Sequence, residues 1–170
     1  MADFKTAYLK LRTLEGYYTL EGGVDSYAGI NRSYFPDERI WYYVDAEKPL
    51  KQGQKLKSGR AESIIEVFYY THFWRDTSLS ILTNDRLATF VFCESVNMGD
   101  RCVKILQGIV ETVQDGILGH KTAVAANDFD GNLIHPLSAG CEAYYRTLCE
   151  ENPSKRKYLS GWLNRIALLS

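Results

Sequence analysis

Residues 3–23, DFKTAYLKLRTLEGYYTLEGG, change within a few positions from a helical pattern to glycine-rich, aromatic chain. Asp3 is a suitable N-cap, because an aspartate side chain can accept from a free N–H group of the first turn. Gly16 is a suitable terminator, since glycine tolerates the backbone that ends a helix. Between them, apolar side chains recur every three or four positions, at Phe4, Ala7, Tyr8, Leu11 and Leu14. We therefore predict an amphipathic helix followed by a lobe without long helices.

Glu15 and Glu21 each precede a glycine in this stretch. Glu15 adjoins the apolar face at the end of the helix, where the helix dipole disfavours an anion. That position does little for stability and suits a carboxyl group that works as an acid. Glu21 fits a solvated turn. From the residues alone, an ordinary surface role is favoured for both carboxylates.

The chain after Gly16 divides into an irregular stretch and a helical remainder. From residue 17 to 49, glycines and Pro36 interrupt short aromatic runs, which predicts loops with room for one short hairpin. Residues 47–60 are rich in basic side chains and are predicted to form a solvated loop. Helical periodicity returns in six segments, at 61–74, 84–99, 100–113, 121–127, 138–151 and 154–169. The expected fold is mainly α, with one irregular lobe after the first helix.

The composition excludes several classes of protein. With 170 residues, 45% of them hydrophobic and 24% charged, the chain is typical of a globular domain. A net charge of −1 gives no general attraction to nucleic acid. The 12 Tyr, 7 Phe and 3 Trp suit either a core or a groove that stacks on sugar rings. Core packing is the favoured interpretation for any single one.

The cysteines and histidines form no metal-binding pattern. Cys93, Cys102, Cys141 and Cys149 include no CxxC pair, and the three histidines are scattered. No apolar run near the N-terminus is long enough for a signal peptide or a membrane span. We therefore expect synthesis in the cytoplasm, with any export by another route, and no metal or organic cofactor.

Common catalytic motifs are absent, including GxSxG, HExxH, GxxxxGK[ST] and GxGxxG. A carboxylate site remains, and glycoside hydrolysis requires one carboxyl group as acid and a second group that positions a water. Glu15 is the candidate acid, with the rings of Tyr17 and Tyr18 as an apolar wall. Asp25 or Ser26 is the candidate for the water. Both also suit a plain turn, because their side chains commonly bond the local backbone.

Several segments resemble, in the same order, a known enzyme family: LEGYY (14–18), EGGVDSYAGINRSYFP (21–36), YYTHFW (69–74), FVFCESVNMGDRCVKILQ (90–107), DGILGHKTAVAAN (115–127) and YLSGWLNRIA (158–167). They are similar to the N-acetylmuramidases of glycoside hydrolase family 108, some of whose bacterial members are named secretion activators. The later part is similar to the peptidoglycan-binding extension that often follows the catalytic region. The resemblance implies a lysozyme-like, mainly helical fold. It also implies a catalytic region at 1–108 and a peptidoglycan-binding-like region at 109–170, packed on it as one compact unit.

The resemblance identifies Glu15 as the implied catalytic acid. Family members end the first helix with Glu-Gly-Gly-Tyr, which Glu15, Gly16 and Tyr18 match while Tyr17 replaces the second glycine. A later Gly-Gly and Thr-Tyr-x-Gly-Ile pattern matches residues 22–30, with Ser26 in place of threonine and one extra residue before it.

The central helix departs from the family at one position. An aspartate that often precedes Val-Asn-x-Gly is replaced by Cys93, whereas Asn97 and its neighbours match. Tyr18, Tyr27 and Asn97 are the expected substrate-binding residues, the rings stacking on sugars and the amide facing an N-acetyl group. The alternatives are core packing for the tyrosines and a helix cap for Asn97.

The leading hypothesis is a peptidoglycan hydrolase that cleaves the β-1,4 bond between N-acetylmuramic acid and N-acetylglucosamine. Glycan strands would be its partner, without nucleic acid, membrane span or cofactor. It would act on the cell wall after release, as phage lytic enzymes do, or after export by a dedicated apparatus. The alternatives are an inactive lysozyme-like protein that binds peptidoglycan for a secretion machine, and an intracellular helical regulator.

Overall fold

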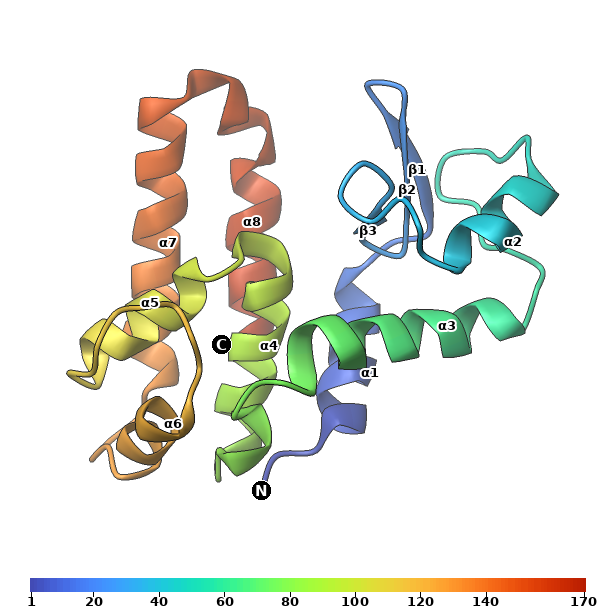
Figure 1. The fold of residues 1–170 in the computed structure, drawn as a ribbon. Helices are drawn as coiled ribbons and strands as arrows, with labels where there is room; N and C mark the ends of the chain where they lie inside the picture. The colour runs from blue at the N-terminus through green and yellow to red at the C-terminus, as the bar shows by residue number, and fades with distance from the viewer. The chain divides into compact units, whose positions relative to one another are not determined.

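The computed structural model describes residues 1–170 and confirms the predicted fold class. It contains eight α-helices and one three-stranded antiparallel sheet (Figure 1). The chain divides into two compact units. The sheet unit comprises Tyr8–His72, and the helical unit comprises Met1–Ala7 together with Phe73–Ser170. No helix is both long and apolar enough to cross a membrane.

The first helix, α1 (Phe4–Leu14), begins and ends where the sequence predicts. The Asp3 carboxylate accepts a hydrogen bond from the Thr6 backbone N–H at 2.8 Å, so it caps the first turn. Tyr8 and Leu11 are buried, and Leu9, on the opposite face, is exposed. Glu15 therefore follows the last helical residue directly.

The sheet follows α1 and consists of β1 (Tyr18–Glu21), β2 (Val24–Tyr27) and β3 (Ile30–Asn31), in that order. Glu21 pairs with Val24 and Tyr27 with Ile30, so both connections are two-residue turns. Both residues of each turn, Gly22–Gly23 and Ala28–Gly29, have positive φ, as type I′ hairpin turns require. The lobe thus holds two hairpins where the sequence predicted room for one.

Two helices complete the sheet unit. The helix α2 (Ile40–Glu47) was not predicted, and it buries Ile40, Trp41 and Val44. The helix α3 (Arg60–Tyr69) was predicted, and it continues into a π-helical turn, η1 (Tyr70–Trp74). The core of this unit is aromatic and aliphatic, with Tyr8, Leu11, Tyr27, Ile30, Ile40, Val44, Ile65 and Tyr69 all at most 2% exposed.

The helical unit is built around α4 (Asp85–Met98) and α5 (Arg101–Ile109). The Asn84 side chain caps α4 by accepting from the Leu87 N–H at 3.1 Å, and Gly99 ends it at a φ of 66°. The short helix α6 (His120–Asn127) follows a loop. The long helices α7 (Ile134–Glu151) and α8 (Arg156–Leu169) run side by side in opposite directions (Figure 1). Two 3₁₀ turns, Leu79–Ile81 and Pro153–Lys155, complete the unit.

A buried ion pair joins α4 to α8 inside the helical unit. Glu94 is fully buried, and its Oε1 lies 3.3 Å from Nε of Arg165. The Tyr145 hydroxyl donates to the other carboxylate oxygen at 3.1 Å, and its ring stacks on Trp162 with 4.7 Å between centroids. Arg165 also donates to the Cys93 carbonyl at 2.8 Å. These contacts fix α7 and α8 against the central helix.

Candidate functional site

The backbone of Glu15 is held at the end of α1. Its N–H donates to the Leu11 carbonyl at 3.0 Å, which completes the last helical turn. The Arg12 guanidinium donates to the Glu15 carbonyl oxygen at 3.1 Å, so a cation satisfies a carbonyl at the helix C-terminus. The Glu15 side chain is half-buried. The candidate acid is therefore placed by a rigid element and partly shielded from water.

The Glu15 carboxyl group lies against the α-carbon of Gly29 in the turn between β2 and β3. A Cβ atom at Gly29 would overlap Oε2 of Glu15, and it would lie 2.8 Å from the carboxyl carbon. The same atom would lie 2.6 Å from the Tyr69 hydroxyl oxygen. Only glycine leaves room for both groups at this point. The glycine of the Tyr-Ala-Gly-Ile pattern thus has a physical role in seating the carboxyl group.

Tyr69 is a site residue that the sequence did not single out. It lies at the end of α3, is 1% exposed, and its hydroxyl donates to the Ala28 carbonyl at 2.7 Å. This bond holds the turn whose Ala28 has an unusual left-handed φ of 53°. In the sequence, Tyr69 begins the segment YYTHFW that resembles the family, and its spacing of four from Ile65 predicts a core residue.

A second carboxylate, Glu62 on α3, shares Arg12 with the Glu15 backbone. Arg12 Nε lies 2.8 Å from Glu62 Oε1, and the Tyr8 hydroxyl donates to the same oxygen at 2.6 Å. Burial raises the pKa of Glu62, but the hydrogen bonds from Arg12 and Tyr8 outweigh it and hold this pKa below its ordinary value. Glu62 is therefore an anion at neutral pH, and it holds Arg12 in place beneath the end of α1.

Asp25 is buried in β2 and engaged in ion pairs. The Tyr18 hydroxyl donates to one carboxylate oxygen at 2.6 Å, and Lys48 Nζ donates to the other at 2.6 Å. Arg32 Nε lies 3.3 Å from the second oxygen. Burial raises the pKa of Asp25, but the hydrogen bonds from Lys48 and Tyr18 and the charges of Lys48 and Arg32 lower it below its ordinary value. Asp25 is thus a fixed anion, beside an open pocket of about 590 Å³ that Leu20 and Lys48 also line.

Ser26 points to the opposite face of the sheet from Asp25, because neighbouring side chains alternate along a strand. Ser26 is half-buried, whereas Asp25 and Tyr27 on the other face are buried. The two candidates for positioning a water therefore do not share a face of β2. A substrate on one face would meet only one of them.

The three expected substrate-binding residues lie in different surroundings. Tyr18 and Tyr27 pair across β1 and β2, are 4% and 2% exposed, and pack in the core of the sheet unit. Tyr27 also accepts a hydrogen bond from the Leu56 N–H at 3.0 Å. Asn97 belongs to the helical unit, is exposed near the end of α4, and donates to the Tyr145 hydroxyl. The sheet unit thus contains Glu15, Asp25, Ser26 and both tyrosines, and Asn97 extends the polar network around Glu94.

The loop between α5 and α6 forms a second concave surface, a pocket of about 520 Å³ in the helical unit. The buried Gln107 holds this loop with both ends of its amide. Its nitrogen donates to Asp115 at 2.7 Å and to the Ile117 carbonyl at 3.1 Å, and its oxygen accepts from the Gly116 N–H at 2.9 Å. The exposed side chains of Val113 and Ile117 add apolar surface here. A preformed loop of this kind suits ligand binding, because little ordering is needed.

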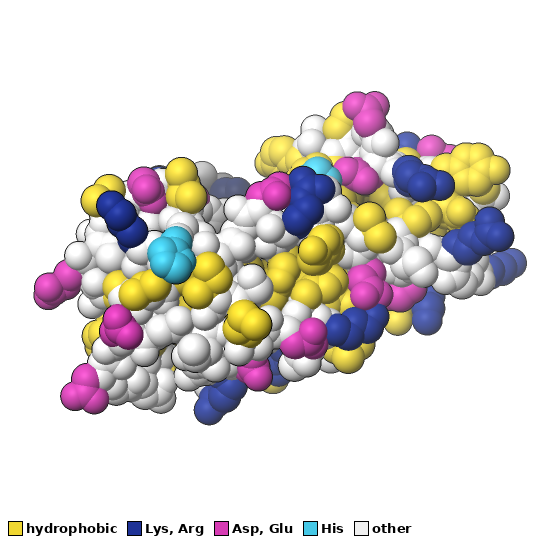
Figure 2. All heavy atoms as spheres, turned by 60° about the horizontal axis from the view of Figure 1, so that its bottom comes forward, with side chains coloured by type: hydrophobic (Ala, Val, Ile, Leu, Met, Phe, Trp, Pro, Cys, Tyr) yellow, Lys and Arg dark blue, Asp and Glu magenta, His cyan; other side chains and the backbone are white.

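Acidic and basic side chains are interspersed on the face that Figure 2 shows, which agrees with the near-zero net charge. No group of three or more His, Cys, Asp or Glu side chains is arranged to hold a metal ion.

Comparisons with known proteins point to peptidoglycan. Residues 101–167 match a family described as "Predicted Peptidoglycan domain", which covers α5 to α8 and the loop held by Gln107. No curated protein matches the chain. The structure of Brucella abortus SagA is similar, with a TM-score of 0.68 and 21% sequence identity, over 98% of this chain and 90% of that chain. At this identity the likeness establishes the fold, and the match associates residues 101–167 with peptidoglycan.

Proposed function

We propose that the protein is a peptidoglycan hydrolase of the N-acetylmuramidase type, as the resemblance to glycoside hydrolase family 108 implies. The observation that carries the proposal is the position of the Glu15 carboxyl group. It lies against the α-carbon of Gly29, in space that a side chain at position 29 would occupy. A general acid must be fixed in orientation and partly removed from water, and the close approach of Glu15 to Gly29 together with its half-buried position supports this role. The family match at 101–167 supports peptidoglycan as the polymer.

In the proposed reaction, Glu15 protonates the oxygen of the β-1,4 bond as that bond breaks. Asp25, an anion fixed by Lys48 and Tyr18, offsets the positive charge that develops on the sugar ring. Either Asp25 or Ser26 positions the attacking water. Because they lie on different faces of β2, only one of them can serve a bound substrate. The division into a catalytic region at 1–108 and a binding region at 109–170 stays a prediction, as does action on the cell wall after release or export.

The second candidate function is a protein that binds peptidoglycan without cleaving it. Both oxygens of Asp25 already accept hydrogen bonds, from Tyr18 and from Lys48, so this carboxylate is less available to a water. The departures from the family at Tyr17 and Cys93 favour the same reading.

The test uses purified peptidoglycan, the wild-type protein, Glu15→Gln and the control Glu21→Gln, which alters an exposed carboxylate at the end of β1. We expect wild type and Glu21→Gln to clear the suspension, and mass spectrometry after borohydride reduction to find new N-acetylmuramitol ends. Glu15→Gln should sediment with the polymer and release nothing. If wild type and Glu15→Gln both bind and neither releases fragments, the binding protein is the correct function.

A further inference from the structure

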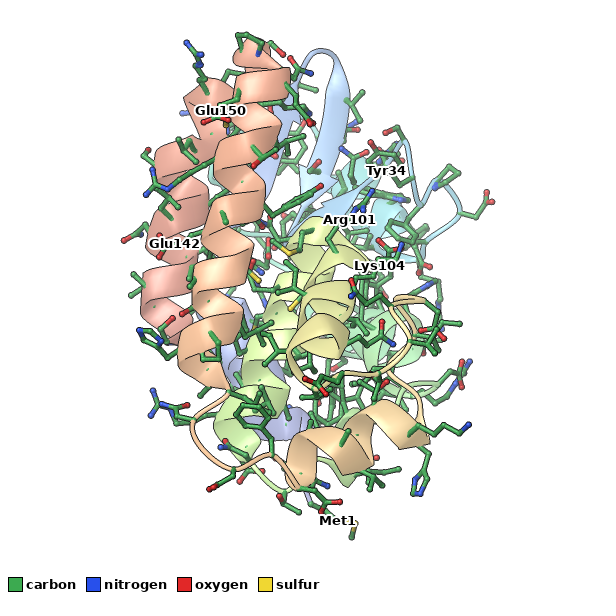
Figure 3. The ribbon with its side chains drawn as sticks, turned by 90° about the vertical axis from the view of Figure 1, so that its left-hand side faces the viewer. Met1, Tyr34, Arg101, Lys104, Glu142 and Glu150 are labelled. Atoms are coloured by element: carbon green, nitrogen blue, oxygen red, sulfur yellow. The ribbon has the colours of Figure 1, made fainter.

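Three helices of the helical unit each bring one cysteine to the same interior. Cys93 on α4, Cys102 on α5 and Cys141 on α7 are free thiols with 0% exposure. Figure 3 shows sulfur atoms in yellow on the inner side of α7, whereas the labelled Glu142, the residue after Cys141, points outward. The sequence spacing gave no hint of this cluster, because its members lie far apart in the chain.

Cys102 and Cys141 are a neighbouring pair in this cluster. Cys141 is the neighbouring group with the strongest effect on the Cys102 thiol, and the helices that carry the two cysteines, α5 and α7, pack against each other. Cys93 lies on α4, which packs against both α5 and α7. Cys149 lies two turns further along α7, roughly 12 Å along the helix axis, and so belongs to another part of the core.

The two helices approach closely at this point because α7 carries a glycine there. A Cβ atom at Gly140 would lie 2.5 Å from Cγ2 of Ile105, so the α7 backbone packs against a side chain of α5. Gly140 precedes Cys141, and Ile105 lies one turn from Cys102. A disulfide requires its two α-carbons within about 4.4–6.8 Å of each other. Close backbone approach beside both cysteines favours this geometry.

We propose that Cys102 and Cys141 are a cross-linking site, at which a small disulfide oxidant converts the two thiols into a disulfide between α5 and α7. The Cys102 thiolate attacks the oxidant, forms a mixed disulfide and releases one thiol. The Cys141 thiolate then attacks the sulfur of Cys102 and releases the second. The two cysteines are oxidised, the oxidant is reduced to two thiols, and these take up the two protons. The site does not depend on whether the protein cleaves peptidoglycan.

Burial determines when the cross-link forms. In the folded protein, the neighbouring Cys141 thiol and then burial raise the pKa of Cys102 well above its ordinary value, so little thiolate is present. The folded, reduced protein is therefore slow to react. The disulfide forms while the chain folds in an oxidising compartment, before α7 closes over α5, or during local opening.

The test compares refolding from denaturant in dithiothreitol with refolding in a mixture of reduced and oxidised glutathione. We expect the oxidised sample to lose about 2 Da, to give one Cys102–Cys141 peptide on non-reducing mapping, and to melt about 5–10 °C higher. Cys149→Ala should form the same cross-link. Cys102→Ala and Cys141→Ala should not.

Peptide mapping of the wild type decides the outcome even if a cysteine variant fails to fold. A disulfide that contains Cys93 in place of either partner would overturn the assignment. Four free thiols after refolding in the glutathione mixture would overturn it as well. A second sample, folded first and then exposed to oxidised glutathione, should remain reduced for much longer. Equal rates in the two samples would contradict the role of burial.

Discussion

Replacing Gly29 with alanine tests whether the position of the Glu15 carboxyl group depends on the absence of a side chain at residue 29. Gly29 has a φ of 79°, and an alanine in this left-handed region costs about 1–2 kcal/mol. The new methyl group would overlap Glu15 Oε2 and lie 2.6 Å from the Tyr69 hydroxyl oxygen, so both side chains must move. Overpacking of this kind costs about 1–3 kcal/mol more. The sum, about 2–5 kcal/mol, corresponds to a fall in Tm of about 4–20 °C for a chain of this length.

Gly23→Ala is the matched control for this change. Gly23 occupies the second position of the β1–β2 turn, as Gly29 does in the next turn, and its φ is 82°. No atom lies within 4 Å of the Cβ that alanine would add there. Gly23→Ala should therefore lower the free energy of unfolding only through the strained backbone conformation. The difference between the two variants isolates the displacement of Glu15 and Tyr69.

Thermal unfolding followed by circular dichroism gives the stability of both variants, and peptidoglycan clearance is measured well below either Tm. We expect Gly29→Ala to be the less stable variant and to lose at least about tenfold in clearance rate, because a misplaced catalytic group is ineffective. Gly23→Ala should clear peptidoglycan like the wild type. Equal stability and equal clearance of the two variants would refute the inference that Gly29 is needed to position the Glu15 carboxyl group.

Three further changes have expected outcomes. The lowered pKa of Asp25 means that its carboxylate stabilises the fold above its unfolded pKa of about 4, and that this stability is lost as the pH falls through the folded pKa. Asp25→Asn, which also weakens the hold on Lys48, should lower stability at pH 7 and flatten its fall below pH ~4, as urea unfolding at several pH values would show. Arg165→Met leaves Glu94 buried without this cation and should cost about 3–5 kcal/mol in guanidinium unfolding, with partial recovery when Glu94→Gln is added. Gln107→Ala removes the bonds that hold the loop before α6, and limited proteolysis should cut there faster than in the wild type; an unchanged rate would contradict its role.

Local patterns in the sequence predicted most of the helices. The spacing of apolar residues and the cap at Asp3 gave α1 and placed Glu15 at its end, because these signals act within a few residues. Helix α2 was missed, since its Ile-Trp-Tyr-Tyr-Val run has the composition of a strand. It is helical because Ile40 and Val44, four positions apart, are both fully buried.

The surroundings of the candidate acid were beyond prediction, because they depend on contacts between distant segments. Ala28 takes a left-handed φ that alanine rarely adopts, so the second hairpin turn has only Gly29 as a local signal. The Tyr69 hydroxyl reaches the Ala28 carbonyl from 41 positions away. Lys48 reaches Asp25 from 23 positions away. No spacing rule links residues so far apart in the chain.

The helical unit is discontinuous in the chain, and this limits how it can be made as a separate fragment. Its first seven residues precede the entire sheet unit, and the rest starts at Phe73. Phe4 packs edge-on against Trp74 and Phe92, with ring centroids 5.5 and 5.9 Å away. A gene truncated at codon 73 would leave that aromatic pocket open to water. Expression of the helical unit with an intact interior calls for a permuted chain, in which the N-terminal residues are rejoined beyond α8 through a flexible linker.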